Sequence, residues 1–203
     1  MSEIKKVGVI GAGTMGSGIA QACGTAGLRA VMIDVAQAAI ERGMSTIDAS
    51  LERLVKKEKV SAQDKTAALK RIESSADYAM LASCDFVVEA ATENEDVKKQ
   101  ILAKVDALAR PGVIIASNTS SISITKLAAA TKRPQRLIGM HFFNPVPMMA
   151  LVEVVRGLQT DDATVEPAGA LAKRLGKVPI VVRNSPGFVV NRLLCPMLNE
   201  AAS

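Results

Sequence analysis

Two residues of the sequence have the types and the spacing of an acid–base pair. His141 is the only histidine, and it directly follows the apolar segment Leu137–Met140. Glu153 interrupts a second apolar segment, Leu151–Val155, where a carboxylate is costly unless a cation or a hydrogen-bond donor meets it. A hairpin-like return of the chain between the two segments would bring the imidazole and the carboxylate together.

Such a pair is suited to moving a proton. Imidazole titrates close to neutral pH, so His141 could take the proton of a hydroxyl group while hydride leaves the same carbon. A buried carboxylate on one ring nitrogen would fix the tautomer and raise the basicity of the other nitrogen. Two alternatives stay open. His141 could be bonded only to the backbone of a loop, and Glu153 could face solvent from an edge strand.

A cluster of polar side chains follows another apolar segment. Val113–Ala116 runs into Ser117-Asn118-Thr119-Ser120-Ser121, at the expected switch from strand to helix. In doubly wound sheets, ligands bind beyond the carboxyl ends of the strands, which is where this cluster and His141 would lie. We expect at least one of the five side chains to cap the following helix and another to meet a ligand.

A glycine-rich turn near the N-terminus stands between two apolar segments. Lys6–Ile10 continues as Gly11-Ala12-Gly13-Thr14-Met15-Gly16, and Arg29–Ile33 ends in Asp34. A glycine triplet alone is weak evidence, but strand, triplet, helix, strand and terminal acid together form the dinucleotide-binding pattern.

Each part of this pattern has a physical role. Gly11 permits the tight turn, Gly13 lets the backbone approach a pyrophosphate, and Gly16 lets the helix pack close to the strand. The start of the helix directs unpaired N–H groups and its positive dipole end at the phosphates. Asp34 would accept hydrogen bonds from an adenosine ribose and would repel a 2′-phosphate. The pattern therefore predicts NAD or FAD, and argues against NADP.

Short apolar segments recur along the chain, with helical stretches between them. They are Val7–Ile10, Ala30–Ile33, Phe86–Glu89, Val113–Ala116, Leu137–Met140, Leu151–Val155 and, after a helix of about Thr160–Leu175, Val178–Val182. Near-continuous Val and Ile strands indicate a sheet that is covered on both faces. The sequence predicts an α/β fold with a doubly wound, Rossmann-type, mainly parallel sheet.

The connection between Asp34 and Phe86 is longer than a simple crossover, which needs only about a dozen residues. It contains a highly charged segment, Ala36–Lys59, and then Ser61–Ile72, which begins like a capped helix. We expect two antiparallel helices, a helical-hairpin excursion over residues 36–72 that forms one wall of a binding cleft.

Composition and charge narrow the classes of function. Hydrophobic residues make up 49% of the 203 residues but aromatic residues only 2%, so the core must be aliphatic. The net charge is +5, yet the basic residues are spread along the chain and few aromatic side chains could stack on bases. No nucleic acid partner is expected. A phosphate-rich small molecule would be attracted by the same charge.

Cysteine usage and hydropathy indicate where the protein works. Cys23, Cys84 and Cys195 are far apart and lack a metal-binding spacing, which predicts reduced thiols, with neither a disulfide nor a metal site. No apolar run reaches the roughly 18 residues of a membrane span. The first strand begins almost at the N-terminus, so we expect no targeting segment. A cytoplasmic protein without a membrane partner is predicted.

The C-terminal part departs from the alternating pattern. Asn184-Ser185-Pro186-Gly187 breaks it, and Phe188–Ala202 resumes a helical pattern with an apolar face that needs a surface to bury against. We predict a nucleotide-binding domain over residues 1–184, followed by a linker and the first helix of an incomplete all-α domain over residues 185–203.

Five segments together resemble the L-3-hydroxyacyl-CoA dehydrogenase family, and most closely its short, single-function members that act on 3-hydroxybutyryl-CoA. They are Gly-Ala-Gly-Thr-Met-Gly at 11–16, Ser-Asn-Thr-Ser-Ser at 117–121, His-Phe-Phe-Asn-Pro-Val-Pro at 141–147, Leu-Val-Glu-Val at 151–154 and Pro-Gly-Phe-Val-Val-Asn-Arg at 186–192. The resemblance covers essentially the whole chain. It implies reversible, NAD-dependent oxidation of a (3S)-3-hydroxyacyl-CoA to the 3-oxoacyl-CoA.

The resemblance also implies roles for single residues. His141 would be the general base in oxidation, Glu153 would orient it, and Ser120 and Asn191 would hydrogen-bond the reacting oxygens of the acyl group. Ser50 and Lys57 match positions that contact coenzyme A. The residues that would bind NAD are Gly11, Gly13, Thr14, Met15, Gly16, Asp34, Glu93, Lys98, Asn118, Ser120 and Asn144.

The resemblance also implies a helical domain that forms a homodimer and shapes the acyl pocket, and we expect these 203 residues to include only its first helix. Two other functions therefore stay open. One is an NAD-binding structural or regulatory relative with impaired turnover. The other is a dehydrogenase of the same architecture that acts on a hydroxy acid without coenzyme A.

Overall fold

The fold is built on a single eight-stranded sheet. The computed structural model describes residues 3–202. The strands are β1 (Lys6–Ile10), β2 (Arg29–Ile33), β3 (Ile72–Ser75), β4 (Phe86–Glu89), β5 (Ile114–Ser117), β6 (Leu137–Phe142), β7 (Leu151–Arg156) and β8 (Val178–Arg183). They lie in the order β3-β2-β1-β4-β5-β6-β7-β8.

Strand direction explains where ligands can bind. In the sheet, the neighbouring strands β3-β2-β1-β4-β5-β6 are all parallel to one another. Strand β7 is antiparallel to β6, and β8 is parallel to β7. The order 3-2-1-4-5-6 is that of the dinucleotide-binding fold, whose crevice lies at the carboxyl ends of the strands. The predicted doubly wound, mainly parallel sheet is confirmed.

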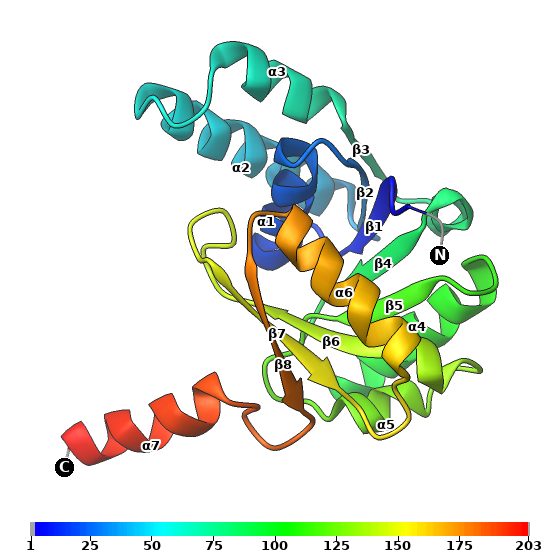
Figure 1. Ribbon diagram of the computed structural model, residues 1–203. Coiled ribbons are helices and arrows are strands. Elements are labelled where there is room, and N and C mark those ends of the chain that lie inside the picture. The colour runs from blue at the N-terminus through cyan, green and yellow to red at the C-terminus, as the bar shows by residue number, and fades with distance from the viewer. Residues whose placement is uncertain (1–2, 203) are drawn as a thin grey trace.

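Helices cover both faces of the sheet (Figure 1). They are α1 (Thr14–Thr25), α2 (Gln37–Lys56), α3 (Ala62–Lys70), α4 (Glu95–Leu108), α5 (Ile124–Ala128), α6 (Asp162–Arg174) and α7 (Val190–Ala202), with 3-10 turns at Tyr78–Ser83 and Pro134–Arg136. One core cluster contains Ile19, Ile47 and Leu171 of α1, α2 and α6. The other contains Leu102 and Leu127 of α4 and α5. Each fully buried aliphatic side chain contributes about 1.5–3 kcal/mol.

The excursion between β2 and β3 consists of two helices, as predicted. Ser61 caps α3 by accepting a hydrogen bond from the Asp64 N–H at 3.0 Å. Lys65 of α3 pairs with Asp48 and Glu52 of α2 at 2.9 and 2.8 Å, which fixes the two helices to each other.

The predicted hairpin over residues 36–72 is wrong at its C-terminal end. Helix α3 ends at Lys70, and Ile72 begins β3, a strand that was not predicted. β3 is the edge strand of the sheet and contains Glu73, Ser74 and Ser75. A strand with a solvated edge needs little apolar sequence, so it carries no strong pattern.

The C-terminal helix is the part of the fold that is packed least. Helix α7 projects away from the sheet in Figure 1, and none of its residues is buried. Its apolar side chains Leu193 and Met197 are 69% and 60% exposed. The helix begins at Val190 and not at the predicted Phe188, because Phe188 has a left-handed backbone (φ 49°) and turns its side chain into the core. Across residues 3–202, no helix is both long and apolar enough to span a membrane.

Candidate active site

The glycine-rich turn joins β1 to α1 with very little space. Gly11 has φ of +100°, and a Cβ atom there would lie 2.5 Å from the Ala90 carbonyl oxygen. A Cβ atom on Gly16 would lie 1.8 Å from the Gly11 carbonyl oxygen, whereas Gly13 faces open space. No side chain caps the start of α1. Its first N–H groups are therefore available to an anion that approaches over Gly13.

Asp34 fixes the adjacent side of the crevice. Its Oδ2 accepts a hydrogen bond from the Ala12 N–H at 2.9 Å, and its Oδ1 accepts one from the Ala36 N–H at 3.1 Å. The carboxylate thus ties the glycine-rich turn to the end of β2. A cavity of about 290 Å³ lies beside it, with Val35 and Ile101 among its lining residues. The size and apolar lining of this cavity suit a flat heterocycle such as adenine.

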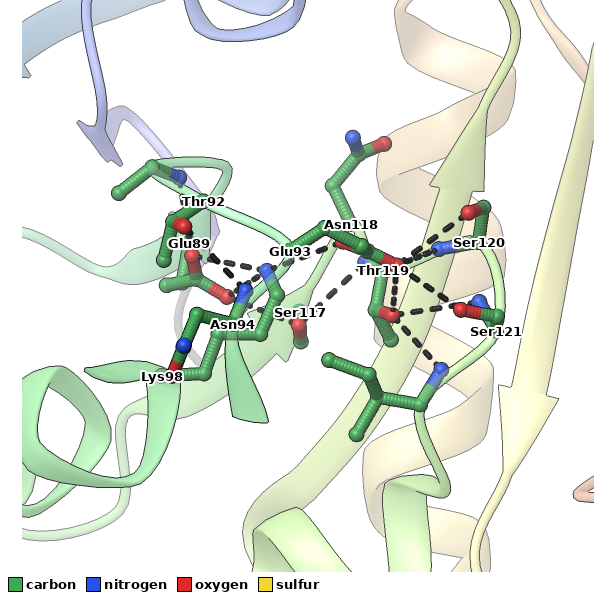
Figure 2. A network of polar contacts seen from close by, with 12 residues as sticks. Glu89, Thr92, Glu93, Asn94, Lys98, Ser117, Asn118, Thr119, Ser120 and Ser121 are labelled. Carbon is green, nitrogen blue, oxygen red and sulfur yellow. Dashed lines mark hydrogen bonds and ion pairs between the residues drawn. The ribbon is translucent and has the colours of Figure 1, made fainter. Parts of the chain in front are cut away.

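The ends of β4 and β5 carry a polar network, shown in Figure 2. Glu93 follows β4, and its Oε1 accepts hydrogen bonds from the Thr119 hydroxyl at 2.5 Å and the Ser120 N–H at 2.9 Å. The hydroxyls of Ser120 and Ser121 donate to the same oxygen at 3.2 and 3.3 Å. Burial raises the pKa of the Glu93 carboxyl, but the hydrogen bonds from Thr119 and Ser120 and the charge of Lys98 together hold that pKa below its ordinary value.

A buried ion pair lies beneath this network, and the sequence analysis missed one of its members. Glu89, the last residue of β4, is fully buried, and so is the Lys98 side chain of α4, at 1% exposure. The Lys98 ammonium donates to both carboxylate oxygens of Glu89 at 2.9 and 2.7 Å. It lies 3.8 Å from Glu93 Oε2. Lys98, a predicted cofactor contact, therefore has its charge engaged by protein carboxylates.

The expected helix cap was misplaced. Ser123, and none of the five residues 117–121, caps α5 by accepting a hydrogen bond from the Lys126 N–H. The Thr119 hydroxyl oxygen instead accepts from the N–H groups of Ser121 and Ile122, which folds the loop tightly before the helix begins.

His141 and Glu153 lie opposite each other on two antiparallel strands. The register of β6 and β7 pairs them directly, and His141 Nδ1 lies 2.7 Å from Glu153 Oε2. His141 belongs to β6 and does not merely follow it, because pairing with β7 extends the strand to Phe142. Glu153 is fully buried, which excludes the alternative of an outward-facing carboxylate.

The other ring nitrogen is left for a ligand. Within residues 3–202, His141 Nε2 makes no hydrogen bond. The ring is 6% exposed and packs against Phe143 and Phe188, whose ring centroids lie 4.4 and 5.8 Å from its own. With a carboxylate on Nδ1, Nε2 is the acceptor nitrogen of the neutral ring. This arrangement can accept a proton from a hydroxyl group.

Glu153 also reaches the start of the C-terminal helix. Its Oε1 accepts hydrogen bonds from the N–H groups of Val189 and Val190 at 2.9 and 3.0 Å. Asn191, in the first turn of α7, donates from its side chain to the Ser120 carbonyl oxygen at 3.4 Å. The four predicted catalytic residues thus lie in two linked contacts, His141 with Glu153 and Ser120 with Asn191.

Asn118 connects the network to the catalytic strand. Its N–H donates to the Glu89 carbonyl oxygen at 2.8 Å, and its side-chain oxygen accepts from the Phe142 N–H at 2.9 Å. Asn144 is exposed in the segment between β6 and β7 and is joined to Pro145 by a cis peptide bond.

Several predicted contact residues lie outside these bonded groups. Thr14 is exposed at the start of α1, and Met15 is half-buried against the core. Ser50 lies on α2 and Lys57 directly follows it, both with surface to offer a ligand. Lys177, which no motif in the sequence singles out, donates from its ammonium group to the carbonyl oxygens of Val146 and Met149 at 2.5 and 2.9 Å.

The sequence from residue 6 to residue 185 matches the family described as "3-hydroxyacyl-CoA dehydrogenase, NAD binding domain". The chain belongs to the 3-hydroxyacyl-CoA dehydrogenase family. NAD is the cofactor of this domain, and the open face at Gly13, the uncapped start of α1 and the cavity beside Asp34 fit its pyrophosphate and adenosine.

Individual members of the 3-hydroxyacyl-CoA dehydrogenase family are close in sequence and structure. The 3-hydroxybutyryl-CoA dehydrogenase of Bradyrhizobium diazoefficiens is 52% identical over 198 residues, which are 98% of this chain and 68% of that protein. The crystal structure of (S)-3-hydroxybutyryl-CoA dehydrogenase from Ralstonia eutropha matches with a TM-score of 0.96 and 61% identity, over 98% of this chain and 70% of that one.

A solved structure with lower sequence identity has the same architecture, and its name gives a different substrate. It is 5-formyl-3-hydroxy-2-methylpyridine 4-carboxylic acid 5-dehydrogenase, an NAD-dependent dismutase, with a TM-score of 0.88 and 36% identity. The match covers 98% of this chain and 64% of that one.

Proposed function

We propose that this protein catalyses the reversible, NAD-dependent oxidation of a short-chain (3S)-3-hydroxyacyl-CoA, such as 3-hydroxybutyryl-CoA, to the 3-oxoacyl-CoA. The observation that carries the proposal is the His141–Glu153 pair. Its inner contact of 2.7 Å is buried, and its outer nitrogen makes no hydrogen bond within the described residues.

In the proposed mechanism, His141 is the general base. Its Nε2 accepts the proton of the 3-hydroxyl group as the C3–H bond breaks. NAD, held over Gly13 and beside Asp34, would supply the acceptor for the hydride that leaves C3. Glu153 keeps Nδ1 protonated and stabilises the imidazolium that forms. In the reverse direction, the same Nε2 returns its proton to the carbonyl oxygen.

Neutral donors complete the site. The hydroxyl of Ser120 and the side-chain amide of Asn191 would hydrogen-bond the oxygen atoms of the acyl group, where negative charge grows as the hydroxyl proton leaves. The hydrogen bond from the Asn191 amide to the Ser120 backbone carbonyl supports this assignment, because it holds the β5–α5 loop and α7 together at this point.

The wider organisation follows from the same proposal. The α2–α3 hairpin, with Ser50 and Lys57, would contact coenzyme A, whose phosphates are attracted by the net charge of +5. Residues 1–184 would form the NAD-binding domain, and residues 185–203 the start of a helical domain that dimerises. We place this activity in the cytoplasm, with no nucleic acid or membrane as partner.

A turnover assay tests the proposal. Acetoacetyl-CoA should be reduced by NADH, with formation of the (3S) product, and the reverse reaction should run with NAD and the hydroxyacyl-CoA. The assay should be repeated on a chain extended through the helical domain of the relatives. Failure of both chains to turn over acetoacetyl-CoA would overturn the proposal.

A hydroxy acid without coenzyme A is the second candidate substrate. The pyridine carboxylic acid dehydrogenase, which shares this architecture, supports this candidate, because the substrate in its name is a carboxylic acid and not an acyl-CoA. Competition separates the two candidates. Saturable inhibition of turnover by free coenzyme A supports the acyl-CoA substrate, and its absence supports the alternative.

A further inference from the structure

We propose that Glu89 and Lys98 form a buried positioning pair for the nicotinamide side of the site, holding Glu93 and the loop Ser117–Ser121 in place. Figure 2 shows the arrangement, with the pair on one side of Glu93 and the loop residues Thr119, Ser120 and Ser121 on the other. The inference deepens the proposed function, and its turnover test rests on that function, whereas its binding test needs only NAD binding.

Glu89 makes hydrogen bonds to the segments that follow β4 and β5. Its Oε1 accepts from the Ala91 N–H at 2.9 Å as well as from Lys98. Its Oε2 accepts from the Ser117 hydroxyl at 2.9 Å as well as from Lys98. The Glu89 backbone oxygen accepts from Asn118. One buried residue thus fixes the chain after β4 and the chain after β5.

The pair acts on Glu93 through charge. The Lys98 ammonium lies between two carboxylates, bonded to Glu89 and 3.8 Å from Glu93 Oε2. Glu93 in turn binds the loop through Thr119 and Ser120. If Lys98 were removed, two carboxylates would face each other without a cation, and Glu93 would turn toward solvent and release the loop.

Other contacts also fix this part of the fold. Helix α4 is already fixed to the sheet by Leu102 and Val105, which are fully buried, and its start is capped by Asn94. A buried ion pair is often no more stabilising than apolar residues of similar volume, because both charges lose their hydration. What apolar residues cannot supply is a fixed set of hydrogen bonds.

The position of the pair indicates which half of the cofactor it affects. The pyrophosphate belongs at the start of α1 and the adenosine beside Asp34 on β2, so the other half extends over the ends of β4 and β5. Loss of the pair should therefore weaken the binding of NADH while leaving the binding of ADP-ribose unchanged.

The decisive variant is the double substitution E89L/K98M, compared with K98M alone. K98M leaves a buried carboxylate without its cation and should lower Tm by about 10 °C. E89L/K98M removes both charges and should recover most of that Tm. The Kd of NADH should stay about tenfold weaker in both variants, with the Kd of ADP-ribose within twofold of wild type, and kcat with acetoacetyl-CoA should fall by about 100-fold.

The matched control is D106N, on the same helix. Asp106 is buried and pairs with Arg133 at 2.5 Å, away from the network. D106N should lower Tm without changing NADH affinity. Recovery of both Tm and NADH affinity in E89L/K98M would overturn the proposal, as would an equal loss of ADP-ribose affinity. An inactive wild type with these binding changes intact would overturn only the proposed reaction.

A milder variant covers the case in which E89L/K98M does not fold. S117A removes one hydrogen bond to Glu89 and the acceptor of the Thr119 N–H. It should weaken the binding of NADH by about threefold or more and leave the binding of ADP-ribose unchanged, in line with the loss of these two hydrogen bonds. Unchanged NADH affinity in S117A would contradict the proposal.

Discussion

The two sides of the crevice differ in the groups that they offer to a ligand. On the β1–β2 side, the turn Gly11–Gly16 offers backbone N–H groups and close approach, and Asp34 is bonded to backbone on both sides. On the β6–β7 side, the proposed chemistry depends on two side chains, His141 and Glu153, that face each other across a strand pair.

This difference determines how each side can be damaged. A backbone site fails when an added atom fills the space that it needs, even if no functional group is lost. A side-chain site fails when one proton acceptor is removed, even if the fold is unchanged. Substitutions that add a methyl group and substitutions that remove a charge should therefore affect different kinetic constants.

The largest effect is expected for H141Q. Glutamine cannot take the substrate proton, so kcat should fall by about 10³–10⁴-fold, the usual contribution of a general base with its partner. The glycine-rich side is untouched, and the Kd of NADH should stay within threefold of wild type. Steady-state kinetics and NADH titration measure both quantities. A tenfold weaker NADH would show that His141 also supports cofactor binding.

E153Q should have the next largest effect. A glutamine oxygen can still accept from Val189 and Val190, but its NH₂ group facing Nδ1 favours the tautomer with the proton on Nε2. We expect kcat to fall by about 10²–10³-fold with little change in NADH affinity. A near wild-type kcat, measured with saturating substrates, would show that Glu153 has no role in the mechanism.

G16A should break the backbone side. The added Cβ would lie 1.8 Å from the Gly11 carbonyl oxygen, so the start of α1 must move away from β1. NADH affinity should fall by about 100-fold, and kcat at saturating NADH should change much less. The control is G169A in α6, where a Cβ meets no atom within 4 Å. This control should keep NADH affinity, and equal losses in both variants would refute the comparison.

The smallest effect is expected for K177M. Lys177 holds the segment between β6 and β7 through the Val146 and Met149 carbonyl oxygens, and burial lowers the pKa of its ammonium group. Methionine keeps the packing but loses both bonds, so the segment that carries Asn144 should loosen. We expect KM values to rise by about two- to threefold with kcat unchanged. A loss in kcat without a change in KM would contradict this role.

The geometry of the β1–β2 side could be predicted from the sequence more directly than that of the β6–β7 side. The strand, glycine and acid pattern around Asp34 is local, so its geometry can be inferred without knowing the fold. The facing of His141 and Glu153 was inferred only because Glu153 interrupts an apolar strand, and their pairing depends on a register that the sequence does not state.

Other parts carried no signal that could be interpreted alone. Glu89 stands at the end of an apolar segment and Lys98 in a charged helix, and only the fold places the lysine against that carboxylate. The strand β3 was missed because its polar residues show no strand pattern. Phe188 was assigned to a helix because nothing in a helical pattern reveals a left-handed residue.

Glu153 gives the C-terminal helix a direct influence on the imidazole. One oxygen of its carboxylate orients His141, and the other holds the N–H groups of Val189 and Val190 where α7 begins. A rotation of α7 that breaks the second contact frees the carboxylate to rotate and changes the first. A partner that rotates α7 on binding would therefore be energetically linked to the orientation of the imidazole, and that orientation would affect the binding to the same extent.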